Sequence, residues 1–316
     1  MALKIEDVTY VYDKGTAMSV DALDHISVEI PDGQFIGLVG HTGSGKSTFV
    51  QMLNGILQPT SGHIYWNGQD IQAQGYDRRK LRAKVGLVFQ YPEHQLFETD
   101  VLADVKFGPR NLGLTEEECT KRAKEALHRV NLPESLWEQS PFDLSGGQKR
   151  RAAIAGVLAM HPDVLVLDEP TAGLDPKGRD EILDMVQEMK NHLHMTIVLV
   201  SHSMDDVAEY ADRILVMNAG KIAMDGTPAE VFARYRELEE FGLAAPQTVY
   251  IMQYLKSLGL PVDTNKLTPK AAAREICAHL RELNEMTGRK FSCTDVSAKE
   301  PAGHLNARME KGEEHV

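Results

Sequence analysis

The sequence Gly-His-Thr-Gly-Ser-Gly-Lys-Ser-Thr at residues 40–48 constrains the fold of this chain more than any other stretch. An apolar run at residues 35–39 precedes it and predicts a buried strand, and residues 49–54 after it continue as a predicted helix. Glycine, four residues and then Gly-Lys-Ser is the P-loop pattern, and the strand–loop–helix order is the context that the pattern requires. A glycine-rich turn that only happens to carry a lysine does not need that context. The sequence therefore predicts a phosphate-binding loop.

The residue types in this loop explain why it binds phosphate. Gly43 and Gly45 allow the backbone to curl so that successive N–H groups point inward, and the start of the following helix adds a partial positive charge. Lys46 can reach the β- and γ-phosphates, and the Ser47 hydroxyl can bind Mg²⁺. We therefore expect a nucleoside triphosphate to bind through residues Gly40, His41, Thr42, Gly43, Ser44, Gly45, Lys46, Ser47 and Thr48.

Charge and hydropathy argue against several classes of function. The 316 residues carry a formal net charge of −12 at pH 7, which opposes binding to the phosphates of nucleic acids. The same charge opposes attachment to an anionic lipid surface by electrostatics alone. No apolar run approaches the roughly 18 residues that a membrane-spanning helix needs. The length suits one large α/β domain with a smaller appendage.

A second acidic element follows the apolar run Val164–Leu167, which predicts a central parallel strand. In P-loop proteins, an aspartate at the end of such a strand helps to hold Mg²⁺, and Asp168 stands at that position. Glu169 is then placed to orient or deprotonate an attacking water. Taken without the P-loop, the same Asp-Glu-Pro sequence fits a simple strand cap equally well.

A second glycine loop, Leu144–Gln148, precedes a predicted helix. Backbone N–H groups and the helix dipole at such a position can face an anion. Serine is also a favoured N-cap residue, so a plain helix start fits Ser145 as well. Two loops suited to phosphate in one chain indicate a composite site.

Across residues 1–240 the chain resembles the nucleotide-binding subunits of ABC (ATP-binding cassette) transporters. The resemblance rests on motifs that follow in the family's order: the P-loop, a Q-loop glutamine at Gln90, the LSGGQ motif at Leu144–Gln148, a Walker B strand at Val164–Glu169, a D-loop at Ala172–Asp175 and a switch histidine at His202.

This resemblance implies roles for individual residues. Two subunits would enclose two ATP molecules, each between one chain's P-loop and the other chain's LSGGQ motif. The residues acting in trans would be Ser145, Gly146, Gly147 and Gln148, with Asp175 in the D-loop. The implied catalytic residues are Glu169, His202 and Gln90, and the implied Mg²⁺ ligands are Ser47, Gln90 and Asp168. Tyr12, which on the residues alone fits an ordinary strand aromatic equally well, would stack on adenine.

Finer detail resembles the ATPases of energy-coupling factor (ECF) transporters, which import vitamins and transition-metal ions. The similarity lies in His41-Thr42 within the P-loop and in Phe89–Phe97 after the next predicted buried strand. Within that group the chain is similar to the second of two paralogous ATPases. The implied partners are a paralogous ABC ATPase, a transmembrane coupling subunit and a substrate-binding membrane subunit, with no nucleic acid. The implied location is the cytoplasmic face of the cell membrane, as a peripheral subunit.

The implied fold is α/β: a P-loop ABC ATPase core with a mixed, mainly parallel sheet, an antiparallel β portion, a helical insertion and a small helical C-terminal domain. We expect the ATPase domain at residues 1–227, with its helical insertion at about 93–160. The C-terminal helical domain is expected at 228–287, and a polar, disordered tail at 288–316. Within the insertion, Trp137 stands in a loop-like stretch and is expected to be exposed.

The loop Tyr91–Phe97 mixes apolar and polar residues directly after Gln90. Exposed apolar groups of this kind mark a partner site, although Leu96 and Phe97 also fit a role in packing under the helical insertion. Two other functions stay open at this point: the ATP-binding subunit of another type of ABC importer, and a soluble ABC ATPase that acts on DNA or the ribosome. The acidic charge and the single cassette, without sustained heptads, disfavour the second.

Overall fold

The computed structural model describes residues 3–287. The tail expected at 288–316 lies outside the described residues. The strands are β1 (Leu3–Tyr12), β2 (Val20–Ile30), β3 (Phe35–Val39), β4 (Ser61–Trp66), β5 (Gln69–Asp70), β6 (Val85–Val88), β7 (Val164–Asp168), β8 (Thr196–Val200), β9 (Arg213–Asn218) and β10 (Lys221–Gly226). The α-helices are α1 (Lys46–Leu53), α2 (Arg78–Lys84), α3 (Val101–Asn111), α4 (Glu116–Arg129), α5 (Gly146–Leu158), α6 (Pro176–Leu193), α7 (Met204–Tyr210), α8 (Pro228–Ala233), α9 (Tyr235–Glu240), α10 (Gln247–Ser257) and α11 (Pro269–Thr287). Short 3₁₀ helices are η1 (Pro92–Gln95), η2 (Glu134–Leu136) and η3 (Pro141–Asp143).

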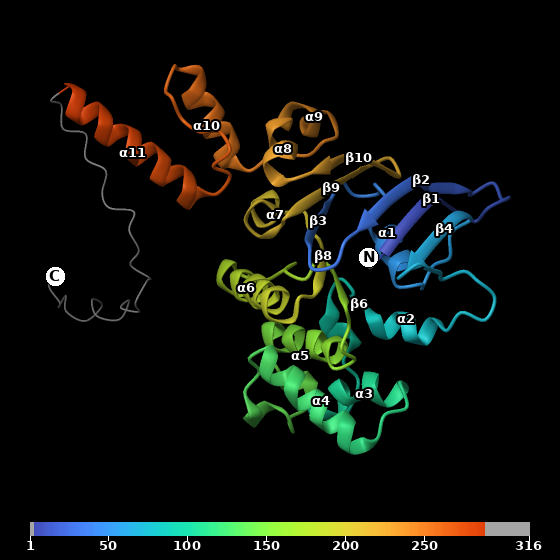
Figure 1. The fold of residues 1–316 in the computed structure, drawn as a ribbon. Coiled ribbons are helices and arrows are strands. Elements are labelled where there is room, and N and C mark those ends of the chain that lie inside the picture. The colour runs from blue at the N-terminus through green and yellow to red at the C-terminus, as the bar shows by residue number, and fades with distance from the viewer. Residues whose placement is uncertain (1–2, 288–316) are drawn as a thin grey trace, which may run out of the picture.

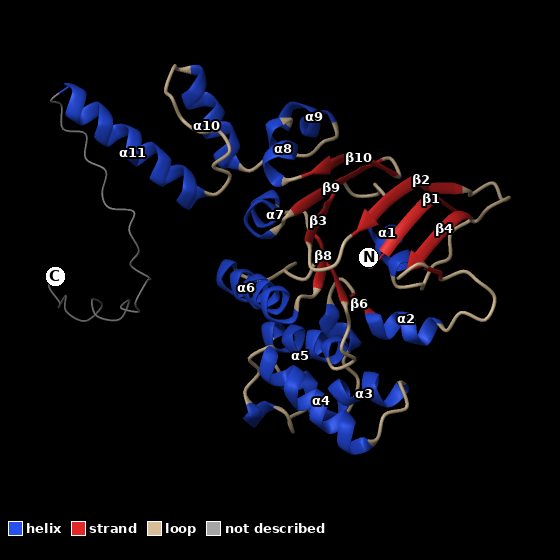
Figure 2. Ribbon diagram, viewed as in Figure 1, coloured by secondary structure: helices blue, strands red, loops and turns tan. Residues whose placement is uncertain are grey.

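Within the described part of the chain, these strands form two sheets (Figure 2). The larger sheet has the order β10-β9-β3-β8-β7-β6, in which only β10 pairs antiparallel to its neighbour. The smaller sheet, β2-β1-β4-β5, is antiparallel throughout. The expected α/β fold, a mainly parallel sheet with an antiparallel portion near the N-terminus, is confirmed.

The large sheet is covered on both faces, which is why its central strands are continuous apolar runs. Every residue of β3, β7 and β8 is buried. Because side chains alternate along a strand, Val164 and Val166 contribute to the core shared with α1 and the small sheet. Leu165 and Leu167 contribute instead to the core shared with α3–α6. Helices α1 and α5 therefore pack against opposite faces of the sheet (Figure 1).

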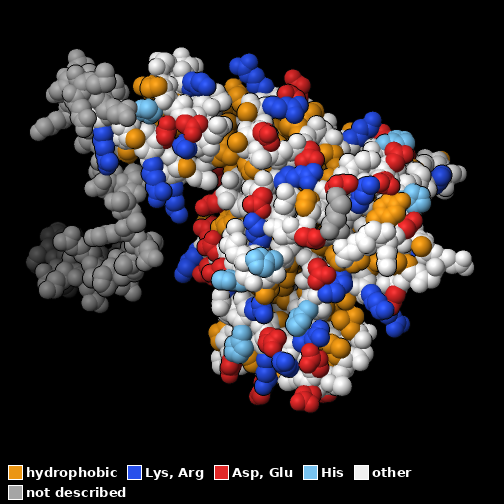
Figure 3. All heavy atoms as spheres, in the orientation of Figure 1, with side chains coloured by type: hydrophobic (Ala, Val, Ile, Leu, Met, Phe, Trp, Pro, Cys, Tyr) orange, Lys and Arg blue, Asp and Glu red, His pale blue; other side chains and the backbone are white. Residues whose placement is uncertain are grey.

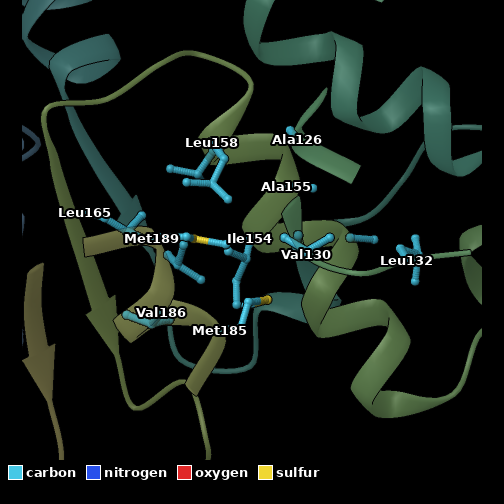
Figure 4. Close-up of a cluster of buried hydrophobic side chains, with 14 of the residues drawn as sticks. Ala126, Val130, Leu132, Ile154, Ala155, Leu158, Leu165, Met185, Val186 and Met189 are labelled. Carbon is cyan, nitrogen blue, oxygen red and sulfur yellow. The ribbon is translucent and has the colours of Figure 1, made fainter. Parts of the chain in front are cut away.

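The helical segment α3–α5 is joined to the sheet chiefly through α5. Its residues Ile154, Ala155 and Leu158 are buried in one cluster with Leu165 of β7 and Met189 of α6 (Figure 4). The long apolar side of α5 is thus fixed against the core. The LSGGQ motif lies at the start of this helix, so the same packing holds the motif in place.

One expectation within the helical segment is wrong. Trp137 is only 6% exposed, and its indole Nε1–H donates to the Leu132 carbonyl oxygen at 3.0 Å. The loop-like composition around it reflects the short 3₁₀ helices η2 and η3 rather than a solvated connection.

The segment after Gly226 is helical, from α8 to α11, and α10 and α11 extend away from the sheets (Figure 1). Ala272 and Ile276 of α11 pack with Met252 of α10. The domain boundaries at residues 227 and 287 stay predictions. None of the described helices is both long and apolar enough to cross a membrane. Acidic and basic side chains are interspersed over the face seen in Figure 3.

Candidate active site

The P-loop connects β3 to α1, and two of its glycines, Gly40 and Gly45, are required by close backbone approaches. A Cβ atom on Gly40 would lie 2.4 Å from the Met217 carbonyl oxygen, and one on Gly45 would lie 2.5 Å from that of Ala22. Gly45 is also the N-cap of α1, with a φ of 102°, a value that side chains with a Cβ rarely allow. By contrast, a Cβ on Gly43 would meet nothing within 4 Å. The loop is therefore tightly fixed at its base and open at Gly43.

Lys46 turns back onto this loop. Its ammonium donates to the carbonyl oxygens of Gly40, at 2.7 Å, and His41, at 3.0 Å, and the residue is 6% exposed. Burial lowers the pKa of Lys46, and the carboxylates of Glu169 and Asp168 oppose that shift. A buried ammonium gains most from an anion brought close to it.

The Ser44 hydroxyl oxygen is buried and has no hydrogen-bond partner among the described residues. Buried polar groups in proteins are normally hydrogen-bonded. Together with Lys46 and the open space at Gly43, this fits a loop that is completed by an anionic ligand.

The remaining loop residues His41 and Thr42 are less buried, and His41 Nε2 lies 3.1 Å from Asn218 Oδ1. Asn218, the last residue of β9, was not among the predicted site residues.

Asp168 ends β7 close to the start of α1. It is 7% exposed, and burial raises the pKa of its carboxyl group, while a hydrogen bond from Ser47 lowers it. The structure thus brings together Ser47 and Asp168, both predicted Mg²⁺ ligands. A hydroxyl beside a carboxylate is an oxygen donor set that suits a hard cation such as Mg²⁺.

Glu169 lies between the other two predicted catalytic residues. Its Oε1 atom is 2.7 Å from His202 Nε2, and its Oε2 atom accepts a hydrogen bond from Gln90 Nε2 at 3.1 Å. The strand order explains the meeting, because β7 lies between β6 and β8 and all three run parallel. Glu169 has a φ of 50°, in the left-handed region where backbone strain is often found at functional sites.

Tyr12 lies at the end of β1, beside the P-loop. Its hydroxyl oxygen is 3.1 Å from Thr48 Oγ1, and the residue is 39% exposed. Its ring meets that of Tyr10 edge to face, with centroids 4.8 Å apart. The structure therefore places this aromatic side chain at the P-loop, with part of its surface exposed.

The LSGGQ motif lies apart from these residues. Ser145 is the N-cap of α5 and forms a capping box with Gln148. Gly146 is exposed, and a Cβ on Gly146 or Gly147 would meet nothing within 4 Å. No hydrogen bond between described residues joins 145–148 to 40–48.

The predicted D-loop residue Asp175 also serves as a helix cap. Its carboxylate accepts a hydrogen bond from Gly178 N at 2.9 Å at the start of α6. An exposed aspartate in this position stabilises the helix start through the dipole. Among the described residues of one chain, no hydrogen bond joins the Asp175 side chain to residues 40–48.

Comparison with known proteins decides the family. A family model described as ABC transporter matches residues 23–172. The energy-coupling factor transporter ATP-binding protein EcfA2 of Caldanaerobacter subterraneus subsp. tengcongensis is 50% identical over 281 residues, which cover 89% of this chain and 98% of that protein. The protein of the same name from Clostridium tetani is 53% identical over 277 residues, covering 87% and 96%. This chain belongs to the family of ATP-binding subunits of ECF transporters.

ABC transporter ATP-binding subunits hydrolyse ATP to drive transport, so this ECF subunit is a transport ATPase. Solved structures agree with that assignment. A structure of cbiO1 from Clostridium perfringens, described as part of the ABC transporter complex cbiONQ, is 42% identical with a TM-score of 0.68, and covers 80% of this chain and 98% of that one. The dimeric cassette MJ0796 bound to ADP and phosphate is 28% identical with a TM-score of 0.65, covering 72% and 98%.

Proposed function

We propose that this ECF ATPase hydrolyses ATP at the residues around Glu169 and uses the energy to move a membrane partner. The observation that carries the proposal is the position of the Glu169 carboxylate, held at both oxygens by Gln90 and His202. A carboxylate fixed in this way is suited to orient a water molecule and accept its proton. His202 and Gln90 would then respond to the presence of the γ-phosphate.

Lys46 and the open P-loop would bind the phosphates, and Tyr12 would contact the adenine. Lys46 would exchange its two carbonyl acceptors for phosphate oxygens, which are stronger partners because they carry charge. Ser47 and Asp168, with Gln90, would hold Mg²⁺, which when bound neutralises charge that develops on the phosphates. Burial raises the pKa of the Asp168 carboxyl group, and a cation bound beside it would favour its ionised form.

The LSGGQ motif would act on the nucleotide of a second subunit. Ser145 and Gly146 are exposed at the N-terminus of α5, a helix of 13 residues, where backbone N–H groups and the dipole favour an anion. Gly147 and Gln148 would complete that surface, and Asp175 would lie near the same interface. We propose a paralogous ABC ATPase as this partner, in line with the numbered names of the EcfA2 relatives.

A groove beside η1 would receive the membrane partner. Its volume is about 680 Å³, and its lining includes Gln95, Leu96, Phe97, Asp104 and Phe107. Phe97 is 56% exposed and meets Phe107 edge to face, whereas Leu96 is buried. Exposed aromatic side chains around a groove are typical of an interaction site.

We propose a transmembrane coupling subunit as the occupant, together with a membrane subunit that binds a vitamin or a transition-metal ion. The chain would then lie peripherally at the cytoplasmic face of the membrane, held by protein contacts rather than by charge. No nucleic acid partner is proposed, because the net charge is −12.

Purification from membranes tests this assignment. The tagged chain is expressed in its native host, the membranes are washed with high salt and extracted with detergent, and the captured proteins are identified by mass spectrometry. We expect a second ABC ATPase and at least one multispanning membrane protein in stoichiometric amounts. The proposal would be contradicted if the salt wash released all of the chain from the membranes, without any partner protein and with full ATPase activity.

A further inference from the structure

Arg150 joins three segments that the sequence keeps far apart. It lies in α5, five residues after Ser145, and is 2% exposed. Its Nη2 donates to both oxygens of Glu93, at 3.1 and 3.2 Å, and its Nη1 donates to the Ala172 carbonyl oxygen at 2.9 Å. A buried guanidinium with several charged or carbonyl acceptors holds its neighbours in a defined geometry.

Each of the two acceptor residues follows a proposed catalytic residue at the same separation in sequence. Glu93 follows Gln90 by three residues, in η1, and Ala172 follows Glu169 by three residues. Gln90 and Glu169 are themselves hydrogen-bonded at 3.1 Å. The contacts therefore form a closed ring: the Gln90–Glu169 bond closes it on one side, and the Arg150 guanidinium closes it on the other.

The guanidinium is carried by a helix that is itself fixed. One turn further along α5, Ile154 is buried against Leu165 of β7 and Met189 of α6 (Figure 4). A displacement of either loop relative to the sheet would therefore break that loop's contact with the buried Arg150 guanidinium, because Arg150 would stay in place with α5. Breaking such a contact is costly because it leaves a charge without its partner.

We infer that Arg150 is a positioning residue for hydrolysis, which holds the Q-loop and the segment after Glu169 so that Gln90 meets the Glu169 carboxylate. The inference rests on the catalytic role proposed above for Glu169. Arg150 makes no hydrogen bond with residues 40–48 or with the Glu169 carboxylate, and its guanidinium donates to Glu93 and Ala172 instead, so it acts through the placement of Gln90. The flanking residue Arg151 makes different contacts: its guanidinium donates to the Val130 carbonyl oxygen and to Glu181 on α6, outside the ring.

The test compares Arg150→Gln and Glu93→Gln with Glu181→Gln in the assembled transporter complex. Because a misplacement of about 1 Å can cost about 100-fold in rate, we expect kcat to fall about 10- to 100-fold in the first two variants. The KM for ATP and the affinity for a non-hydrolysable ATP analogue should stay within about 3-fold, since Lys46 and the P-loop lie outside the ring. Glu181→Gln removes the carboxylate partner of Arg151, the neighbour of Arg150 on α5, and should leave kcat unchanged.

A double-mutant cycle separates positioning from general stability. In a Gln90→Ala background, Arg150→Gln should lower kcat by less than about 2-fold, because the group through which it acts is already absent. The same loss in both backgrounds, or a loss of kcat that matches a loss of folded protein measured by thermal unfolding, would overturn the inference. If Arg150→Gln folds poorly, Glu93→Gln replaces it in the cycle with Gln90→Ala, because the introduced amide keeps a neutral acceptor for Arg150.

Glu169→Gln, measured in parallel, distinguishes this inference from the proposed function. Wild-type turnover in Glu169→Gln would contradict the proposed role of Glu169. Loss of turnover in Glu169→Gln with wild-type kcat in both Arg150→Gln and Glu93→Gln would overturn the role of Arg150 alone.

Discussion

The Nε2 atom of His202 lies 2.7 Å from the Oε1 atom of Glu169. The two residues follow neighbouring parallel strands, and Asp168 of β7 pairs directly with Val200 of β8. The contact therefore follows from the strand order rather than from any local sequence signal. It gives the chain a histidine that contacts the carboxylate proposed to act on water.

His202→Ala should reduce hydrolysis without preventing ATP binding. Removal of the imidazole frees one oxygen of Glu169 and removes a group placed to sense the γ-phosphate, so we expect kcat to fall by at least about 10-fold. ATP affinity, measured by equilibrium binding, should change little. His63→Ala is a matched control, because His63 Nδ1 lies 2.9 Å from Asp70 in an exposed pair on the small sheet. A similar kcat for both variants would remove His202 from the proposed mechanism.

Lys46→Ala should act on binding itself. Hydrogen bonds to charged groups contribute about 1.5–3 kcal/mol each, so loss of the ammonium should weaken ATP binding by roughly 10- to 100-fold. Titration of the purified chain with a fluorescent ATP analogue measures the change. Lys84→Ala, which removes an exposed lysine paired with Asp163, should bind ATP like the wild type. Equal affinity of Lys46→Ala and wild type would show that the nucleotide binds elsewhere.

Much of this site could be predicted from the sequence because its motifs are local. The P-loop and the strand ending in Asp168 can each be recognised from about a dozen consecutive residues. The parallel sheet then brings the P-loop and Asp168 together. The ring around Arg150 could not be predicted in this way. Its contacts span 57 residues to Glu93 and 22 residues to Ala172, and nothing in one sequence separates Arg150 from Lys149 or Arg151.

The error at Trp137 has a related cause. Prolines and polar residues around it predict a loop, and loops lie mostly at the surface. Burial of the indole depends on Leu132 and on His128 of α4, whose ring lies 4.8 Å from that of Trp137 between centroids. Tertiary packing of this kind outweighs local composition.

Ser145→Arg tests whether the LSGGQ motif acts in trans. The substitution places a bulky charge at the N-terminus of α5 and leaves residues 40–48 unchanged. We expect ATP binding by the isolated chain to persist within about 3-fold, while ATPase activity of the assembled complex falls about 100-fold. Equal loss of binding by the isolated chain would show that the motif acts on the chain's own nucleotide.

Replacement of Gln95 and Phe97 by alanine tests the groove. Both side chains line it, and among the described residues neither is hydrogen-bonded to Glu169, whose carboxylate meets Gln90 and His202. ATP binding should stay close to that of the wild type, while recovery of membrane subunits and substrate uptake in reconstituted vesicles should fall together, because large exposed aromatic groups contribute strongly to protein contacts. Leu193→Ala removes an exposed apolar side chain outside the groove and should do neither. Retention of both assembly and uptake in the double variant would place the coupling surface elsewhere.

The steady-state ATPase rate of the purified transporter complex carrying Glu169→Gln, measured with ATP binding on the same sample, tests the central claim most directly. The amide keeps the shape of the side chain but is neither a base nor a carboxylate partner for His202. We predict a loss of turnover of about 100- to 10,000-fold, with ATP still bound and the two ATPase subunits held together by it. Turnover at the wild-type rate, or loss of ATP binding along with turnover, would contradict the role of Glu169 and the mechanism built on it.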